Sequence, residues 1–292
     1  AQLVATSGKS WDVKAATAPP TELAPGKAFD TIFTTKVPED EPYTRPYFTR
    51  ASLEDAYYKI APGAPLNAPT APYPLAAEVK FGYDGVTIEA RKGVQVVSRV
   101  VGPGTLRFPM PVGPAVSVAI TPSAGIVPLG TKSFPVSVRL HNNVDGAAKE
   151  TVHLDIPSGW HSEPASIPVD FTQVGQDQTV VFTVQPEVQD GKRYEVTAVA
   201  DYDGRAYREG YVVTGYTGLR PYYLYSPAKY ETTGTEVKMA PGETIGYIEG
   251  SGDDVPASLE ALGVHVVFLK AQDLAGADLH KYDEILVGLR AC

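Results

Sequence analysis

Four Asp-Gly pairs divide this 292-residue chain, and they constrain its fold more than any other feature. They lie at 84–85, 145–146, 190–191 and 203–204. An Asp-Gly pair between two runs of alternating apolar residues favours a tight β-hairpin, because both central turn positions require a positive φ. The 27 glycines and 26 prolines are also residues that turns require. The sequence therefore predicts a mainly β protein with antiparallel strands.

The first β module is predicted over residues 21–113, after an N-terminal extension over residues 1–20. Alternating runs at 77–83 and 86–90 flank the first Asp-Gly pair, so they predict a hairpin. A third run at 94–101 predicts another strand. We interpret this region as a β-sandwich.

The clearest β pattern covers residues 114–216. Strands are predicted at 116–121, 133–142, 149–155, 178–184, 194–201 and 207–214. Short strands separated by regularly spaced turns are typical of an immunoglobulin-like sandwich. We therefore expect a second sandwich, of the immunoglobulin-like type, in this region.

The pattern changes after a connector over residues 217–243. Apolar runs at 244–248, 264–269 and 284–288 alternate with segments of helical spacing. This order predicts a parallel sheet with flanking helices. Three strands are fewer than a doubly wound domain has, so we expect residues 244–292 to be the truncated start of an α/β domain, and the chain to be a fragment.

Charge and composition narrow the function. A net charge of −9 argues against a nucleic-acid surface, which requires clustered Lys and Arg. No apolar run is long enough to span a bilayer. The five histidines lie at 141, 153, 161, 265 and 280, too far apart for a local zinc-ligand pair. We expect no catalytic residue, no metal site and no cofactor in this chain.

Asp253 and Asp254 form the polar pair with the most informative position. They follow the first strand of the predicted parallel sheet and precede a helix, where open α/β sheets bind ligands. The alternative is that one of them caps the helix and complements its dipole. Both interpretations remain open on the sequence alone.

Four aromatic residues are candidates for carbohydrate binding, because an exposed ring can pack against the C–H groups of a sugar. They are Trp160, Tyr222, Tyr223 and Tyr225. The alternative is that these rings pack inside a sandwich or between modules. The sequence does not decide between the two roles.

The second sandwich carries a family resemblance. The turn at 156–160, the strand at 180–186 and the strand at 191–200 resemble the sandwich domain that follows the NPCBM module in bacterial alpha-galactosidases. That domain also occurs in other secreted bacterial proteins that act on glycans.

The tail carries a second resemblance. Residues 245–256 and 287–291 resemble the C-terminal half of large bacterial PIG-L (LmbE-like) deacetylases. In that family a zinc-dependent N-acetyl-sugar deacetylase domain comes first, sandwich modules follow, and a domain similar to class I glutamine amidotransferases comes last. The resemblance implies a non-catalytic accessory region of a secreted or periplasmic protein. It also implies partners among the other domains of the same parent chain, and contact with glycan.

The chain departs from this family in two places. No histidine is followed by Pro-Asp-Asp, so the resemblance implies that the zinc and the catalytic domain lie outside this chain. The family's tail motif ends in Arg-Ala-Tyr, where this chain has Arg290, Ala291 and Cys292. The alternative hypotheses are a stand-alone carbohydrate-binding or adhesion sandwich pair, and an α/β domain with its own activity.

Overall fold

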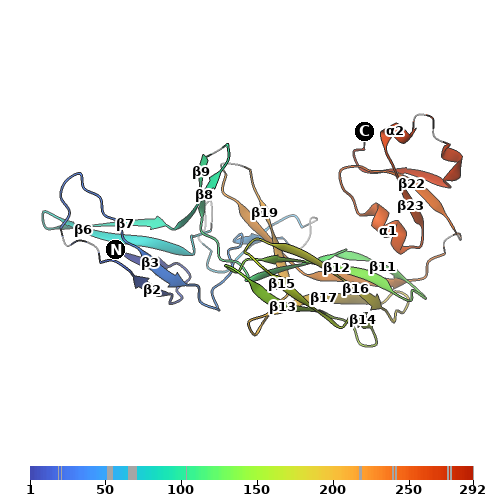
Figure 1. Cartoon of the computed structure of the whole chain (residues 1–292), viewed down its shortest axis with the longest axis horizontal. Coiled ribbons are helices and arrows are strands. Elements are labelled where there is room, and N and C mark those ends of the chain that lie inside the picture. Colours follow the sequence, from blue (N-terminus) through green and yellow to red (C-terminus); the bar gives the residue numbers. More distant parts are fainter. Residues whose placement is uncertain are drawn as a thin grey trace. The chain divides into compact units, whose positions relative to one another are not determined.

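In the computed structural model, whose helices and strands Figure 1 labels, the chain forms two compact units. Unit 1 comprises Ala1–Pro114 and Tyr211–Tyr225, and unit 2 comprises Ala115–Gly210 and Ser226–Cys292. The chain therefore passes between the units three times, after Pro114, Gly210 and Tyr225. The structure describes all residues except 19, 21, 51–54, 65–70, 103, 217–218, 239, 241, 275, 277 and 292.

Unit 1 is built from small sheets. In the residues that the structure describes, one sheet has three strands in the order β1-β6-β7, and the two-stranded sheets are β2-β3, β4-β5, β8-β9 and β19-β20. The sequence predicted a β-sandwich over residues 21–113, whereas these strands form separate sheets of two or three strands. The strands are β1 (Gln2–Ala5), β2 (Asp12–Ala15), β3 (Phe33–Lys36), β4 (Phe48–Thr49), β5 (Lys59–Ile60), β6 (Leu75–Tyr83), β7 (Val86–Gly93), β8 (Gln95–Val100), β9 (Gly104–Pro109), β19 (Glu209–Thr214) and β20 (Tyr222–Pro227).

The prediction of a separate N-terminal extension over residues 1–20 is wrong. Strand β1 pairs with β6, and β2 pairs with β3. Trp11 is buried in one cluster with Leu75 and Val112. The first residues therefore supply part of the core of unit 1.

The predicted hairpin around the first Asp-Gly pair is confirmed. Strands β6 and β7 pair antiparallel, with Tyr83 opposite Val86 next to the turn. Asp84 has a φ of 48° and Gly85 a φ of 77°, as a two-residue turn requires.

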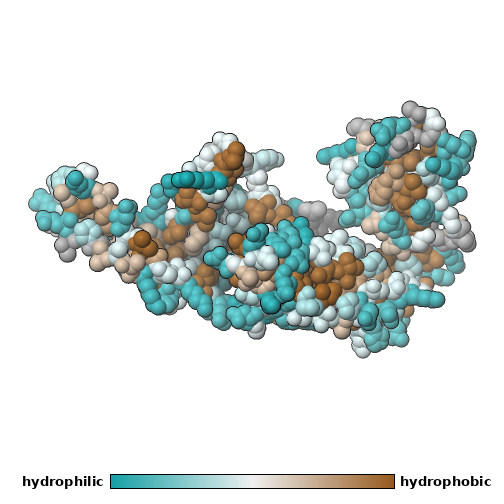
Figure 2. Space-filling view, viewed as in Figure 1, coloured by the Kyte–Doolittle hydropathy of each residue, from teal (hydrophilic) through white to brown (hydrophobic). Residues whose placement is uncertain are grey.

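Unit 1 leaves several apolar side chains on its surface. The β8–β9 ribbon has an apolar tip, seen as brown surface in Figure 2, where Val100 and Val101 are exposed. Small two-stranded ribbons have no second layer to cover both faces, which explains this exposure.

Two larger sheets make up most of unit 2. Their strand orders are β10-β12-β16-β14 and β11-β21-β17-β13-β15, with β18 beside β17. One continuous cluster of buried residues forms the core of this body, and along β12 buried residues alternate with less buried ones. The strands are β10 (Val116–Thr121), β11 (Ala124–Pro128), β12 (Phe134–Asn142), β13 (Ala148–Asp155), β14 (His161–Glu163), β15 (Ser166–Phe171), β16 (Asp177–Gln185), β17 (Arg193–Tyr202), β18 (Arg205–Tyr207) and β21 (Lys229–Thr235). The predicted mainly β class is confirmed.

The predicted connector over residues 217–243 needs correction. It contains β20 and also β21, which pairs parallel with β11 and antiparallel with β17. Strand β21 is thus an interior strand of the larger sheet. The strand predicted at 207–214 is divided between β18 and β19, and its residues 211–214 belong to unit 1.

The last part of unit 2 contains three parallel strands in the order β23-β22-β24. They are β22 (Thr244–Ile248), β23 (His265–Leu269) and β24 (Glu284–Val287). Between them lie α1 (Val255–Ala261), the short α2 (Ala271–Leu274) and the 3₁₀ helix η1 (Leu279–Lys281). Pro256 lies in the first turn of α1, where its missing N–H costs no hydrogen bond.

Candidate functional site

Trp160 is buried, so it does not offer a ring face to a sugar. Its side chain is only 3% exposed and packs against Phe134 and Tyr194, with ring centroids 6.0 and 5.1 Å away. Its Nε1 donates a 2.9 Å hydrogen bond to the carbonyl of Glu187. The predicted role of Trp160 in carbohydrate binding is therefore corrected: the turn before it directs the indole into the core of the sandwich.

Tyr225 belongs to a stack of aromatic rings inside unit 1. Its ring stacks on Tyr43 at 5.8 Å, and the Tyr211 ring lies 5.4 Å away. The guanidinium of Arg45 lies 4.1 Å from the Tyr225 ring centroid and 5.7 Å from that of Tyr43. Cation–π and aromatic contacts of this kind stabilise a fold by about 0.5–1.5 kcal/mol each. This stack fastens the returning segment Tyr211–Tyr225 to unit 1.

Tyr222 and Tyr223 line a narrow crevice in unit 1. Two arginines, Arg45 and Arg220, also line it. Five further residues complete its walls: Thr44, Pro46, Ala71, Pro109 and Pro221. The crevice is open to solvent, and its volume of about 20 Å³ holds a water molecule but not a sugar ring.

The two tyrosines of the crevice also contact rings deeper in unit 1. Tyr222 lies 6.3 Å from Phe48, and Tyr223 lies 5.6 Å from Tyr211. Burial, together with the neighbouring Tyr211, raises the pKa of Tyr223. The structure thus brings Tyr222, Tyr223 and Tyr225 onto one strand, β20, while Trp160 lies in unit 2.

Asp253 is fully engaged within the chain. Its carboxylate accepts hydrogen bonds from the Tyr247 hydroxyl, from the N–H of Val255 at 3.2 Å and from the N–H of Leu289 at 3.2 Å. The hydrogen bond from Tyr247 holds the pKa of Asp253 below its usual value, and the same bond raises the pKa of Tyr247 to about 12. Asp253 therefore ties the start of α1 to the end of β24, which favours the structural interpretation over a ligand-binding one.

Asp254 is the N-cap residue directly before α1, but its side chain makes no capping hydrogen bond. Its backbone carbonyl accepts from both the N–H and the hydroxyl of Ser258. The expected capping role therefore falls mainly to Asp253, whose carboxylate receives the N–H of Val255.

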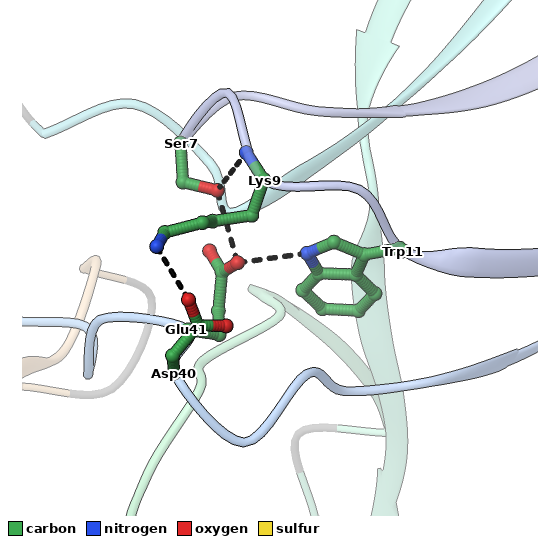
Figure 3. A network of polar contacts seen from close by, with 5 residues as sticks. All are labelled: Ser7, Lys9, Trp11, Asp40 and Glu41. Carbon is green, nitrogen blue, oxygen red and sulfur yellow. Dashed lines mark hydrogen bonds and ion pairs between the residues drawn. The ribbon is translucent and has the colours of Figure 1, made fainter.

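Unit 1 contains a buried carboxylate, Glu41, which the sequence did not indicate (Figure 3). Glu41 is 5% exposed, and its Oε2 accepts from Trp11 Nε1 and from the Ser7 hydroxyl, both at 2.9 Å. Beside it, Lys9 forms an ion pair with Asp40, which raises the pKa of Lys9 and lowers that of Asp40. This network joins the β1–β2 turn to the loop that carries Glu41.

A second buried carboxylate lies in unit 2 and has no partner. Glu150 on β13 is 4% exposed, and neither carboxylate oxygen forms a hydrogen bond. Desolvation raises the pKa of Glu150 to about 7. Glu150 lies in the same alternating series as Ala148, Val152 and Leu154, which are all buried. This alternation along β13 could have indicated from the sequence that Glu150 is buried.

Over the described part of the chain, no group of three or more His, Cys, Asp or Glu side chains is arranged to hold a metal ion. No helix within the same residues is both long and apolar enough to cross a membrane.

Comparison with known proteins gives a limited result. No protein-family model matches the chain, and no curated protein sequence matches it. Among solved structures, the chain is similar to the periplasmic chaperone SfaE, with 12% identity, a TM-score of 0.26, and coverage of 44% of this chain and 66% of that one. It is also similar to the YadV chaperone, with 13% identity, a TM-score of 0.23, and coverage of 43% and 55%. The chain thus spans less than two thirds of each chaperone, and scores this low carry no inference about function.

Proposed function

We propose that this chain is a non-catalytic accessory region of a larger secreted or periplasmic protein, where it holds neighbouring domains together. The observation that carries the proposal is the path of the chain, which connects the two units three times. A single flexible linker is the usual connection between independent domains. Three connections suit a scaffold better than a pair of separate binding modules.

The aromatic stack supports the same proposal. Tyr225, Tyr211, Tyr43 and Arg45 use their rings and charge to fasten the returning segment to unit 1. Residues that were candidates for glycan contact therefore have a demonstrable packing partner within the chain.

The resemblance in the sequence supplies the parent protein for this proposal. It is a PIG-L-type deacetylase, with an immunoglobulin-like sandwich in unit 2 and the start of a glutamine-amidotransferase-like α/β domain after residue 243. In this arrangement zinc and the catalytic residues belong to a domain encoded before Ala1.

The test begins with the gene that encodes this chain. We expect an Ala-His-Pro-Asp-Asp-type zinc motif upstream of Ala1, and zinc-dependent release of acetate from N-acetylated sugar oligomers by the encoded protein. Deletion of residues 1–292 from that protein should leave kcat on a short oligomer unchanged and raise KM on the polymer. A gene without an upstream zinc motif would refute the deacetylase assignment.

Glycan binding at the crevice is a second candidate function. It is favoured by the two tyrosines and two arginines that line one opening. Because the crevice is too small for a sugar ring, a glycan would bind across its mouth. The test compares glycan-array binding of the intact chain with the Tyr223→Ala variant, using Tyr216→Ala as a control on an exposed tyrosine of the same unit. Equal binding by all three proteins would remove this candidate.

A further inference from the structure

The β6–β7 ribbon of unit 1 has one apolar face and one charged face. Cross-strand partners in an antiparallel pair share a face, so the register assigns every side chain. Four large apolar side chains on one face are 39–77% exposed: Phe81, Tyr83, Val86 and Ile88. The apolar face is formed by the pairs Val79–Ala90, Phe81–Ile88 and Tyr83–Val86.

The opposite face carries two cross-strand ion pairs. Lys80 Nζ lies 2.6 Å from Glu89 Oε1, and Arg91 Nε lies 3.4 Å from Glu78 Oε1. Along β7 the charge is therefore negative at Glu89 and positive at Arg91, two residues later.

The outer edge of β7 has no strand beside it in the described part of the chain, since β7 pairs only with β6. Every residue from Val86 to Lys92 is exposed. Alternate residues of such a strand direct their N–H and C=O groups toward the open edge. An open edge of this length is a template for a strand of another chain.

We propose that β7 pairs antiparallel with β7 of a second copy of this chain, with Ala90 opposite Ala90 across a two-fold axis. In this register Glu89 lies opposite Arg91 of the second copy, and the contact occurs twice by symmetry. The charged side chains then form a row across four strands. The row runs from Lys80 and Glu89 of one copy to Arg91 and Glu78 of the second copy. The signs alternate along the whole row.

Other registers are disfavoured by the same residues. A shift that centres Glu89 or Arg91 on the axis places like charges directly opposite each other, which is destabilising. A shift of one residue places the apolar face of one ribbon beside the charged face of the other. Ala90 is the centre that keeps the faces aligned and pairs opposite charges.

The apolar face also gains from this register. Ile88, which is 52% exposed, lies opposite Lys92 of the second copy. The aliphatic part of a lysine can cover such a side chain while its ammonium group stays in water. The small Ala90 side chains allow close approach at the centre of the interface.

The test is sedimentation equilibrium of the full chain over micromolar to millimolar concentrations. We expect a monomer–dimer equilibrium. Glu89→Arg places Arg opposite Arg91, and Arg91→Glu places Glu opposite Glu89, so each variant alone should raise the dimer Kd by about tenfold. An equimolar mixture of the two variants should recover dimers, because every contact across the mixed interface then joins opposite charges.

Two charge changes elsewhere in unit 1 serve as controls. Asp30→Arg and Arg107→Glu alter exposed residues outside the ribbon by the same charge and should leave the Kd unchanged. Far-UV circular dichroism of all variants shows that they are folded. A chain that stays monomeric throughout, or a mixture that dimerises no better than its components, overturns the proposal.

Discussion

The two units differ in how their interiors are stabilised. Among its described residues, unit 2 buries a cluster of 21 apolar side chains in which valine is the commonest type. In the part of unit 1 that the structure describes, the buried apolar cluster has three residues, Trp11, Leu75 and Val112. Unit 1 adds stacked tyrosines with an arginine and a hydrogen-bonded carboxylate. Where the sheets are too small to face each other, ring contacts and polar networks supply part of what a layered core supplies elsewhere.

The two buried glutamates show the difference most directly. Glu41 in unit 1 accepts hydrogen bonds from Trp11 and Ser7. Glu150 in unit 2 is buried, and neither of its carboxylate oxygens has a hydrogen-bond partner. A buried polar group that lacks a partner retains its full desolvation penalty. The larger core of unit 2 can tolerate that penalty, whereas the smaller core of unit 1 depends on its carboxylate being paired.

The chain has two tryptophans, and each unit contains one of them. Trp11 fluorescence reports on unit 1 and Trp160 fluorescence on unit 2. Substitution of one tryptophan therefore leaves the other as a probe, which makes the comparison between the units measurable.

The largest effect is expected for Trp160→Ala. The change removes a fully packed indole and its hydrogen bond to Glu187, so it should lower the free energy of unfolding of unit 2 by about 3–5 kcal/mol. Urea unfolding followed by far-UV circular dichroism measures this loss, while Trp11 fluorescence follows unit 1. If the urea midpoint of the Trp11 fluorescence transition falls by the same amount, the two units do not unfold independently.

Glu150→Gln should change the pH dependence of unit 2. Below pH 4.5 the carboxyl is protonated in both the folded and unfolded chain. Between the unfolded value of 4.5 and the folded pKa of about 7, only the unfolded state ionises, so the wild-type stability falls as pH rises and levels off above pH 7. The loss is about 3 kcal/mol at most.

The measurement for Glu150 is urea unfolding at pH 5 and pH 8 with and without Glu150→Gln, both in a Trp11→Phe background, in which the tryptophan fluorescence comes from Trp160 alone. The glutamine variant should lose less stability than the wild type over this interval, because glutamine does not ionise. Equal losses in the two proteins would show that Glu150 does not titrate in this range.

Trp11→Phe tests the paired carboxylate of unit 1. The ring remains apolar, but Glu41 loses the donor at Nε1, which should cost about 1–2 kcal/mol. Since the variant lacks the fluorescent probe of unit 1, near-ultraviolet circular dichroism of the tyrosines follows unfolding. Phe48→Leu, which changes a ring outside the network, provides the comparison.

The smallest effect is expected for Arg45→Lys. Lysine keeps the charge but lacks the planar guanidinium that lies over the Tyr225 ring. We expect a loss of about 0.5–1 kcal/mol in unit 1, measured by urea unfolding in a Trp160→Phe background, in which Trp11 is the fluorescent probe. Arg50→Lys, beside the exposed Tyr58, should have a smaller effect; a larger one would contradict the importance of the stack.

Local signals in the sequence predicted much of the strand content. Asp84 and Asp203 both have a φ of 48°, and each lies in the hairpin turn that its Asp-Gly pair indicated. Strand β10 begins and ends at the predicted residues. These features depend on neighbours in the chain, which the sequence displays.

The features that the sequence missed depend on distant partners. Strand β21 buries Tyr230, Thr232 and Gly234, so its inward positions are not an apolar series and its alternation is invisible. Trp160 follows a turn whose direction only the fold determines. Asp253 is satisfied by the N–H of Leu289, 36 positions later, a contact that no local pattern indicates.

The return of the chain to unit 1 has a consequence for its synthesis. When Pro114 has left the ribosome, unit 1 still lacks the residues Tyr211–Tyr225, which follow most of unit 2. Domains usually fold in the order in which they emerge. Here the first unit to be started must wait for part of the second to be made, so its strands stay unpaired during synthesis. A chain that is cut short before Tyr225 leaves unit 1 unfinished.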